Sequence, residues 1–125
     1  MNIISTPLSP SAIGPYSQAV RVWDTLYLSG QIALDPNTMT MVQWSLIEEC
    51  EQIIANMRNI LRDAGLEIHN VVKTTIFLTD IADFQAVNEV YGKYFTHKPA
   101  RSTVAVKSLP KWARVEIECI AYQGE

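Results

Sequence analysis

The chain has 125 residues, 48% of them apolar, and a formal net charge of −3 at pH 7. This length and composition fit one domain, residues 1–125, with a single core. The ten basic residues are scattered and outnumbered by acidic ones, which argues against nucleic acid as a partner. No apolar run approaches the length of a membrane span and the N-terminus lacks a signal-peptide pattern, so we expect a soluble, unprocessed protein.

The first third of the chain predicts an ordered turn followed by a β-hairpin. A Gly-Pro pair precedes Tyr16 and fixes the direction of its side chain. Two β-rich runs, Ala19–Val22 and Thr25–Leu34, then predict the strands of the hairpin. Ser29 and Gly30 interrupt the second run, which indicates either a bulge or the close approach of a ligand or another backbone.

The middle of the chain predicts a long amphipathic helix. Ser45 and Glu48 have the spacing of a capping box, and Gly65 is placed to end the helix. The apolar positions at helical spacing are Ile47, Cys50, Ile54, Met57, Leu61 and Ala64. The positions expected on the solvent face are Glu48, Glu49, Glu51, Arg58, Asn59 and Arg62.

A central strand and a second helix follow. Val71–Leu78 is β-prone at nearly every position, as expected for a strand buried on both faces. Asp80 is placed to cap a helix that ends before Lys98. The apolar stripe of this helix consists of Phe84, Val87, Tyr91 and Tyr94 or Phe95. Asn88 lies beside the stripe, a position that favours an amide satisfied by the backbone.

Residues 101–121 hold two alternating runs on either side of a turn, and a hairpin is the simplest connection. Pairing of the runs would set Arg101 opposite Glu118 and Thr103 opposite Glu116 on one sheet surface. Such a patch fits either a solvated face with an ion pair or a functional site. The pattern alone leaves both interpretations open.

These elements give the order β-β-α-β-α-β-β, an α+β fold with a single mixed sheet of about six strands and two helices on one face. Two helices cover only one face of such a sheet, yet the other face also carries apolar residues beside its charges. We therefore expect a homo-oligomer that stacks these faces and places the charges in clefts between subunits.

The usual motifs of metal, nucleotide and nucleophile chemistry are missing. The sequence has no HExxH, no CxxC pair, no glycine-rich phosphate loop and no GxSxG, and His69 and His97 stand apart from any acidic cluster. We expect no metal and no cofactor. Cys50 falls in a helical pattern and Cys119 on an apolar strand face, which predicts two buried thiols in a reducing cytosol.

Four segments resemble the RidA family, also called YjgF, and together they span nearly the whole chain. They are IGPYSQA (13–19), LSGQIALDP (28–36), VVKTTIFLTDIADFQAVNEVYGKYF (71–95) and PARSTVAVKSLPKWARVEIECIA (99–121). The resemblance implies a chorismate-mutase-like homotrimer in the cytoplasm, with sites between subunits. The implied activity is that of a 2-iminobutanoate/2-iminopropanoate deaminase. Such an enzyme hydrolyses reactive 2-imino acids, the enamine/imine products of pyridoxal-phosphate enzymes such as threonine dehydratase, to 2-oxo acids and ammonia.

The resemblance also implies roles for single residues. Arg101 would bind the substrate carboxylate, Glu116 would shuttle protons for the attacking water, and Tyr16 would close the site. The positions that would line the site around the substrate are Ser29, Gly30, Asn88 and Thr103.

The chain departs from the family pattern at a few positions. Family members often carry cysteine where Thr103 stands, so retention of the activity would mean that no thiol nucleophile is needed. Met39 replaces a usual glycine in a turn, and Cys50 replaces a usual glutamine in the first helix. Those two changes bear on loop shape and oligomer contacts more than on chemistry.

Two other functions stay open at this level. Some proteins of the family are described as translation inhibitors, endoribonucleases or chaperones, so a non-catalytic or RNA-directed regulator is the main alternative. The acidic balance of the chain counts against RNA. A sensor that binds a 2-oxo acid in the same cleft without turnover is the second alternative.

Overall fold

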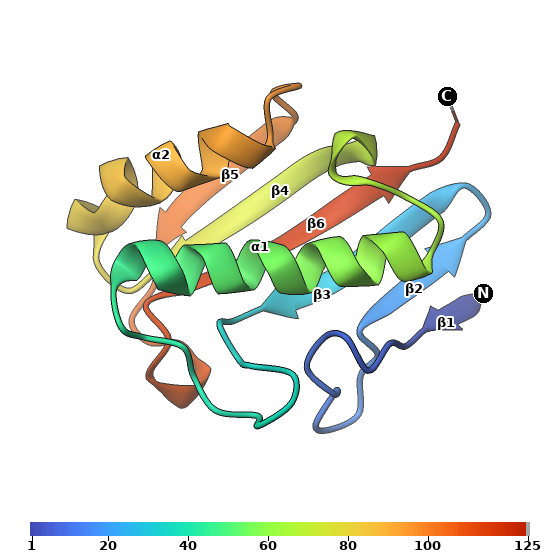
Figure 1. Cartoon of the computed structure of the whole chain (residues 1–125). Helices are drawn as coiled ribbons and strands as arrows, with labels where there is room; N and C mark the ends of the chain where they lie inside the picture. Colours follow the sequence, from blue (N-terminus) through green and yellow to red (C-terminus); the bar gives the residue numbers. More distant parts are fainter. Residues whose placement is uncertain (125) are drawn as a thin grey trace.

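The computed structural model describes residues 1–124 and contains six strands and two helices within them (Figure 1). The strands are β1 (Asn2–Ile4), β2 (Ala19–Val22), β3 (Thr25–Gln31), β4 (Val71–Leu78), β5 (Ala100–Ala105) and β6 (Val115–Tyr122). The helices are α1 (Leu46–Asp63) and α2 (Phe84–Tyr94), and short 3₁₀ turns are η1 (Ile68–Asn70), η2 (Ile81–Asp83) and η3 (Pro110–Trp112). The predicted α+β order is confirmed, and β1 is a further strand that the sequence patterns did not indicate.

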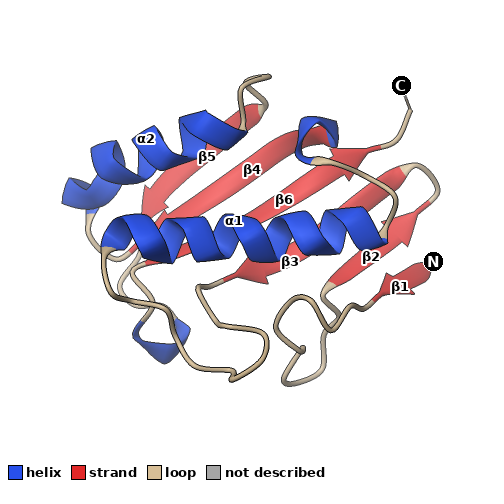
Figure 2. Ribbon diagram, viewed as in Figure 1, coloured by secondary structure: helices blue, strands red, loops and turns tan. Residues whose placement is uncertain are grey.

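All six strands form one mixed sheet in the order β1-β2-β3-β6-β4-β5, and both helices lie on the same face of it (Figure 2). The β4–β5 pair is parallel, because α2 carries the chain back to the end of the sheet from which β4 started. The other pairs are antiparallel. The single mixed sheet with two helices on one face is therefore as predicted.

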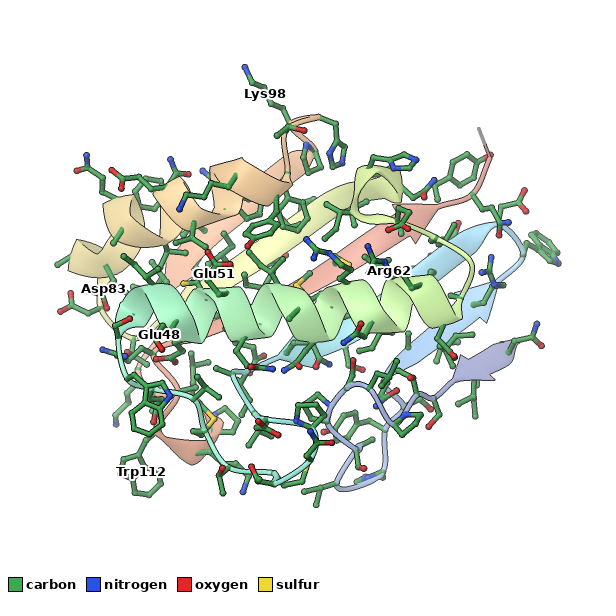
Figure 3. All side chains as sticks on the ribbon, in the orientation of Figure 1. Glu48, Glu51, Arg62, Asp83, Lys98 and Trp112 are labelled. Carbon is green, nitrogen blue, oxygen red and sulfur yellow. The ribbon has the colours of Figure 1, made fainter. Side chains whose placement is uncertain are left out.

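The ends of α1 follow the predicted signals. The Ser45 hydroxyl oxygen accepts a hydrogen bond of 3.1 Å from the Glu48 backbone N–H, and Gly65 has a φ of +79° just beyond the C-cap. Such a left-handed φ favours glycine. The largely buried face of α1 includes Cys50, Ile53, Ile54, Met57, Ile60 and Leu61. Glu48 and Arg62 lie at the two ends of the helix on its solvent side (Figure 3).

Two assignments on α1 are wrong. Ile47, placed in the apolar stripe, is exposed, and Glu49, placed on the solvent face, is fully buried. The Glu49 carboxylate accepts hydrogen bonds from the backbone N–H and the Nε of Arg114, both at 2.8 Å. A buried carboxylate needs such partners because its desolvation is costly. Helical spacing could not reveal this, because the partner lies 65 residues further along the chain.

The stripe of α2 is largely as predicted. Val87, Tyr91 and Phe95 are buried, and the rings of Tyr91 and Phe95 stack with centroids 4.3 Å apart. Asp80 caps the η2 turn immediately before α2, where its side chain accepts a hydrogen bond from the Ala82 N–H. The apolar stripe of α2 thus faces the sheet, and the opposite side of the helix faces solvent.

The predicted C-terminal hairpin does not form, because β5 and β6 do not pair. β4 lies between them, with Ile76 registered against both Thr103 of β5 and Ile117 of β6. The nine residues 106–114 between the two strands span the roughly 10 Å of two strand spacings with ease, so no tight turn is enforced. Arg101 is therefore not opposite Glu118, nor Thr103 opposite Glu116.

The sheet face away from the helices is partly apolar, as expected. Tyr27 and Val104 are exposed on it, and Phe77 and Ile120 are only partly buried. In residues 1–124, no helix is both long and apolar enough to cross a membrane. The two cysteines are buried and unpaired, as predicted, and burial raises the pKa of the Cys50 and Cys119 thiols to about 12.

Candidate active site

A first cleft, the Tyr16 cleft, opens beside the end of β3 and has a volume of about 400 Å³. Its walls come from the loop before β2, the segment after β3 and the η3 turn, which lie along the lower edge of Figure 1. Residues that line it include Ile13, Tyr16, Gly30, Ile32, Leu34 and Glu116. The walls are thus largely apolar, with one carboxylate among them.

Gly30 brings the backbone of β3 against the Glu116 side chain. The pairing of β3 with β6 shifts register between Leu28 and Gln31, which is the bulge allowed for in the sequence. A Cβ atom on residue 30 would lie 2.4 Å from Oε2 of Glu116, so no other residue fits unless the carboxylate moves. The bulge, one of the two alternatives for this glycine, is therefore present, and the group that approaches its backbone is a side chain.

Glu116 has an altered acidity in this setting. Partial burial raises the pKa of its carboxyl above the ordinary value, and the negative charge of Glu118 raises it further. The carboxyl therefore exchanges its proton closer to neutrality than an exposed glutamate does. This is the property that a proton-shuttling group requires.

Tyr16 stands on an exposed loop over the cleft. Its hydroxyl accepts a weak hydrogen bond of 3.4 Å from the Ile13 N–H, and Gly14 takes a φ of +121° in the turn between them. Ser29 ties the loop to β3, since its hydroxyl donates to the Ser17 carbonyl at 2.6 Å. The Ser29 side chain therefore serves the loop in this chain and is already hydrogen-bonded.

Gln18 is a buried residue of this cleft that the sequence did not single out. Its Oε1 accepts from the Thr6 N–H at 2.7 Å, and its Nε2 donates to the Pro10 carbonyl at 2.8 Å and the Thr6 carbonyl at 3.0 Å. One amide thus closes the base of the loop that carries Tyr16. A lone glutamine before a strand gives no pattern that predicts such a role.

A second cleft, the Arg101 cleft, lies between α2 and β5 at the upper edge of Figure 1 and has a volume of about 370 Å³. Asn88 and Tyr91 of α2 line it together with Phe95, which follows the helix, and with Pro99 and Arg101. Lys98 at the rim points away from the sheet (Figure 3). Of the two cationic residues that line the cleft, Arg101 lies on a strand and Lys98 lies in a loop.

The Arg101 guanidinium has neutral partners. Nη1 donates to Oδ1 of Asn88 at 2.6 Å, and the guanidinium carbon lies over the rings of Phe84 at 5.6 Å and Tyr91 at 5.0 Å from their centroids. Among residues 1–124, no carboxylate lies within 4.0 Å of it. The favoured interpretation of Asn88 as a backbone-satisfied amide is wrong, because this side chain orients Arg101.

Thr103 lies two residues further along β5 than Arg101. Its hydroxyl oxygen is buried and has no hydrogen-bond partner in the part of the chain that the structure describes. No base in residues 1–124 is therefore hydrogen-bonded to this oxygen to activate it as a nucleophile.

One chain does not bring its predicted site residues together. Arg101 is registered against Thr74, which is buried beneath α2, whereas Glu116 is registered against Phe77 on the opposite face of the sheet. The structure therefore groups Asn88, Arg101 and Thr103 in one half and Tyr16, Ser29, Gly30 and Glu116 in the other. In residues 1–124 no group of three or more His, Cys, Asp or Glu side chains could hold a metal ion.

Residues 6–123 match the model of the family described as Endoribonuclease L-PSP. The chain belongs to this family, the RidA family. A human member named 2-iminobutanoate/2-iminopropanoate deaminase is 51% identical over 123 residues, which are 98% of this chain and 90% of the human protein.

Solved RidA-family structures have the same fold. The crystal structure of a putative endoribonuclease from Thermotoga maritima matches with a TM-score of 0.97 and 45% identity, covering 100% of this chain and 99% of that one. The structure of TdcF from E. coli, solved with bound serine, matches with a TM-score of 0.94 and 37% identity, covering 99% and 100%. The resemblance stated from the sequence is thereby confirmed.

Proposed function

We propose that this chain is a 2-iminobutanoate/2-iminopropanoate deaminase, which hydrolyses reactive 2-imino acids to 2-oxo acids and ammonia and so prevents metabolite damage. Relatives that carry this name are about half identical to it over nearly their full length, which supports the reaction class. The single observation that carries the proposal is Arg101, a guanidinium held by Asn88 with no carboxylate of residues 1–124 beside it. The charge is oriented and free for an anionic ligand.

Arg101 would bind the carboxylate of the imino acid through two parallel N–H donors. This orients a small, flat substrate so that its C=N carbon faces a water molecule. The iminium carbon is already electrophilic, so positioning and proton transfer are the main tasks that remain for the protein.

Glu116 is the best candidate for moving those protons. As a carboxylate it takes a proton from water while the oxygen attacks the iminium carbon, and it returns that proton to the nitrogen. It then takes the proton of the new hydroxyl as the C=O bond forms and the C–N bond breaks, and ammonia leaves. Its raised pKa suits both directions of transfer. Tyr16 closes the cleft over the reacting group and limits the access of bulk water.

A complete site then needs two copies of the chain, because Arg101 and Glu116 lie on opposite faces of one sheet. We propose a chorismate-mutase-like homotrimer in which the Arg101 cleft of one subunit faces the Tyr16 cleft of its neighbour. The partly apolar sheet face, with Tyr27 and Val104 exposed, supports burial against other copies. The two unpaired thiols support a cytoplasmic location.

The function is tested by generating 2-iminobutanoate from threonine with a dehydratase and following 2-oxobutanoate release. We expect the first-order decay of the imine to accelerate in proportion to the added protein. An inactive Arg101→Ala variant of unchanged assembly is the control. Decay at the same rate with and without the wild-type protein would contradict the proposal.

The description of the family model favours one alternative, an RNA-directed function. The net charge of −3 counts against it, because RNA binding relies on neutralising phosphates. RNA affinity that falls steeply with salt and survives Arg101→Ala would support this alternative. Binding of a 2-oxo acid without any imine hydrolysis would instead indicate a sensor.

A further inference from the structure

Three side chains of α2 form a cradle beneath Arg101. Phe84, Asn88 and Tyr91 are spaced i, i+4 and i+7, so they lie on one side of the helix. The Asn88 amide oxygen accepts one N–H of the guanidinium, and the guanidinium carbon lies over the rings of both Phe84 and Tyr91. Arg101 is thereby contacted by one amide oxygen and two aromatic rings.

Tyr91 is itself held in place from below. Its hydroxyl shares a buried hydrogen bond of 2.7 Å with Thr74 of β4, and its ring stacks on Phe95. Thr74 is the residue registered against Arg101 across the sheet, so strand and helix fix the same ring from two directions. The ring is a rigid platform and not a mobile surface group.

An aromatic face orients a guanidinium without neutralising it. The ring quadrupole attracts the cation, and a ring carries no carboxylate oxygen to occupy its N–H donors. A carboxylate in the same place would also hold Arg101, but it would compete with an anionic ligand for those donors. The cradle therefore suits a site that must remain ready for a carboxylate.

We propose that Phe84 and Tyr91 are positioning residues of the carboxylate site, because their rings fix the plane in which Arg101 presents its free N–H groups. This inference rests on the proposed function, in which Arg101 binds the substrate carboxylate. The two rings do not touch the reacting C=N group. They act on affinity through Arg101, and the chemical step proceeds as before.

The test compares ring-face variants with a matched control. Phe84→Leu and Tyr91→Leu remove the rings, whereas Phe84→Tyr and Tyr91→Phe retain them. Tyr94→Leu is the control, since Tyr94 is an aromatic residue of the same helix that lies beneath Arg58 at 5.2 Å and not beneath Arg101. Binding of 2-oxobutanoate and of its neutral amide, 2-oxobutanamide, is measured by calorimetry on the assembled protein.

We expect Phe84→Leu and Tyr91→Leu to weaken 2-oxobutanoate binding by about five- to thirty-fold. Binding of the amide should stay as in the wild type, and the loss in turnover should appear in KM and not in kcat. Phe84→Tyr and Tyr94→Leu should bind 2-oxobutanoate like the wild type, and Tyr91→Phe, which keeps the ring but loses the hydrogen bond to Thr74, should bind with an affinity between those of the wild type and Tyr91→Leu. Because Phe84 is partly exposed, its leucine variant tests the inference even if Tyr91→Leu does not fold.

Two binding results would overturn the inference. One is Phe84→Leu binding 2-oxobutanoate as tightly as the Tyr94→Leu control, and the other is Phe84→Tyr being as weak as Phe84→Leu. The proposed function fails separately, through a wild-type protein that does not accelerate imine hydrolysis. Wild-type turnover with unchanged KM in the ring variants would reject the cradle alone.

Discussion

The two clefts are built in different ways, although they are proposed to serve one reaction. The Arg101 cleft stands on α2 and β5, so its geometry follows from a helix and a strand. The walls of the Tyr16 cleft are mostly irregular segments, which buried polar side chains hold in place. Gln18 closes the loop before β2, and the Asn56 amide donates to the carbonyls of Leu34 at 2.9 Å and Ile32 at 3.3 Å.

This difference shows how a small fold can give two parts of a site different tolerance to change. A cleft on regular elements depends mainly on the functional side chain and on the side chains of the same elements that contact it directly. A cleft on loops also depends on residues behind it, because buried carbonyl and N–H groups that lose their partners are costly. Substitutions at the two clefts should separate these two kinds of dependence.

The largest effect is expected at the Arg101 cleft. Arg101→Ala should lower kcat/KM by at least ~100-fold, equivalent to about 2.7 kcal/mol of transition-state stabilisation. Arg101→Lys should remain far below wild type, because lysine supplies the charge without the planar fork. Steady-state kinetics on 2-iminobutanoate measure both.

The same substitution should hardly change stability, since Arg101 bonds only the exposed Asn88 among its polar neighbours in residues 1–124. Thermal unfolding and light scattering check that the variant keeps its fold and assembly. A well-folded Arg101→Ala protein that hydrolyses the imine at the wild-type rate would remove Arg101 from the site.

Gln18→Leu should destabilise the loop that forms one wall of the Tyr16 cleft. It leaves the Thr6 N–H and the Pro10 carbonyl without their buried partner, so the free energy of unfolding should fall by about 2–4 kcal/mol. We expect kcat/KM to fall by roughly ten-fold as Tyr16 loses its fixed position. Gln85→Leu, at an exposed position on α2, is the matched control and should stay within about 0.5 kcal/mol. Equal stability and activity of the two variants would contradict the role of Gln18 in holding the loop that carries Tyr16.

Glu118→Gln should shift a pH profile while leaving the maximum rate nearly unchanged. The Glu118 charge contributes to the raised pKa of Glu116, so its removal lowers that pKa. Glu116 must be ionised to accept a proton from water, hence the acidic limb of kcat/KM should move to lower pH. A limb that does not move, or moves to higher pH, would argue against Glu116 as the base.

The linked effect on stability has a definite sign. Native Glu116 keeps its proton to higher pH than the unfolded chain does, so its contribution is present below the unfolded pKa and is lost as pH rises through the native pKa. Replacing Glu118 with glutamine should reduce this loss. Chemical unfolding curves taken across the acidic limb would show it.

Thr103→Ala should have the smallest effect, with kcat/KM within about two-fold of wild type. Its buried hydroxyl has no partner to lose in residues 1–124, so Thr103→Val, which keeps the shape, should be as stable as wild type or more so. A loss of activity above about ten-fold in an intact assembly would assign the hydroxyl an essential role.

The regular part of the structure could be predicted from the sequence because its signals are local. Ser45 and Gly65 mark the ends of α1, and alternating apolar residues mark β6. Gly30 indicated a bulge as one of two alternatives, because glycine within a strand often marks either a bulge or a close approach. The pairing of β5 with β4 could not, since the linker between β5 and β6 is long enough for either topology.

The site was only partly predictable for the same reason. The family resemblance singled out Arg101, Glu116 and Tyr16, but the sequence placed Arg101 and Glu116 on one surface through a hairpin that does not form. The roles of Gln18 and Glu49 depend on partners distant in the chain, which no periodicity reports. The spacing of Phe84, Asn88 and Tyr91 places all three on one side of the helix, as the cradle requires. The same spacing is also typical of an ordinary stripe of core residues.

We propose that the two clefts meet between subunits, and mixed oligomers of two inactive variants test this arrangement. Arg101→Ala and Glu116→Gln are each expected to be inactive, and they are unfolded and refolded together in equal amounts. Roughly a quarter of the sites should then combine an intact Arg101 from one subunit with an intact Glu116 from another. We predict recovery to about that fraction of wild-type activity, with native mass spectrometry showing three-chain species of about 42 kDa, three times 14.1 kDa. Mixed oligomers no more active than either parent would contradict a site shared between subunits.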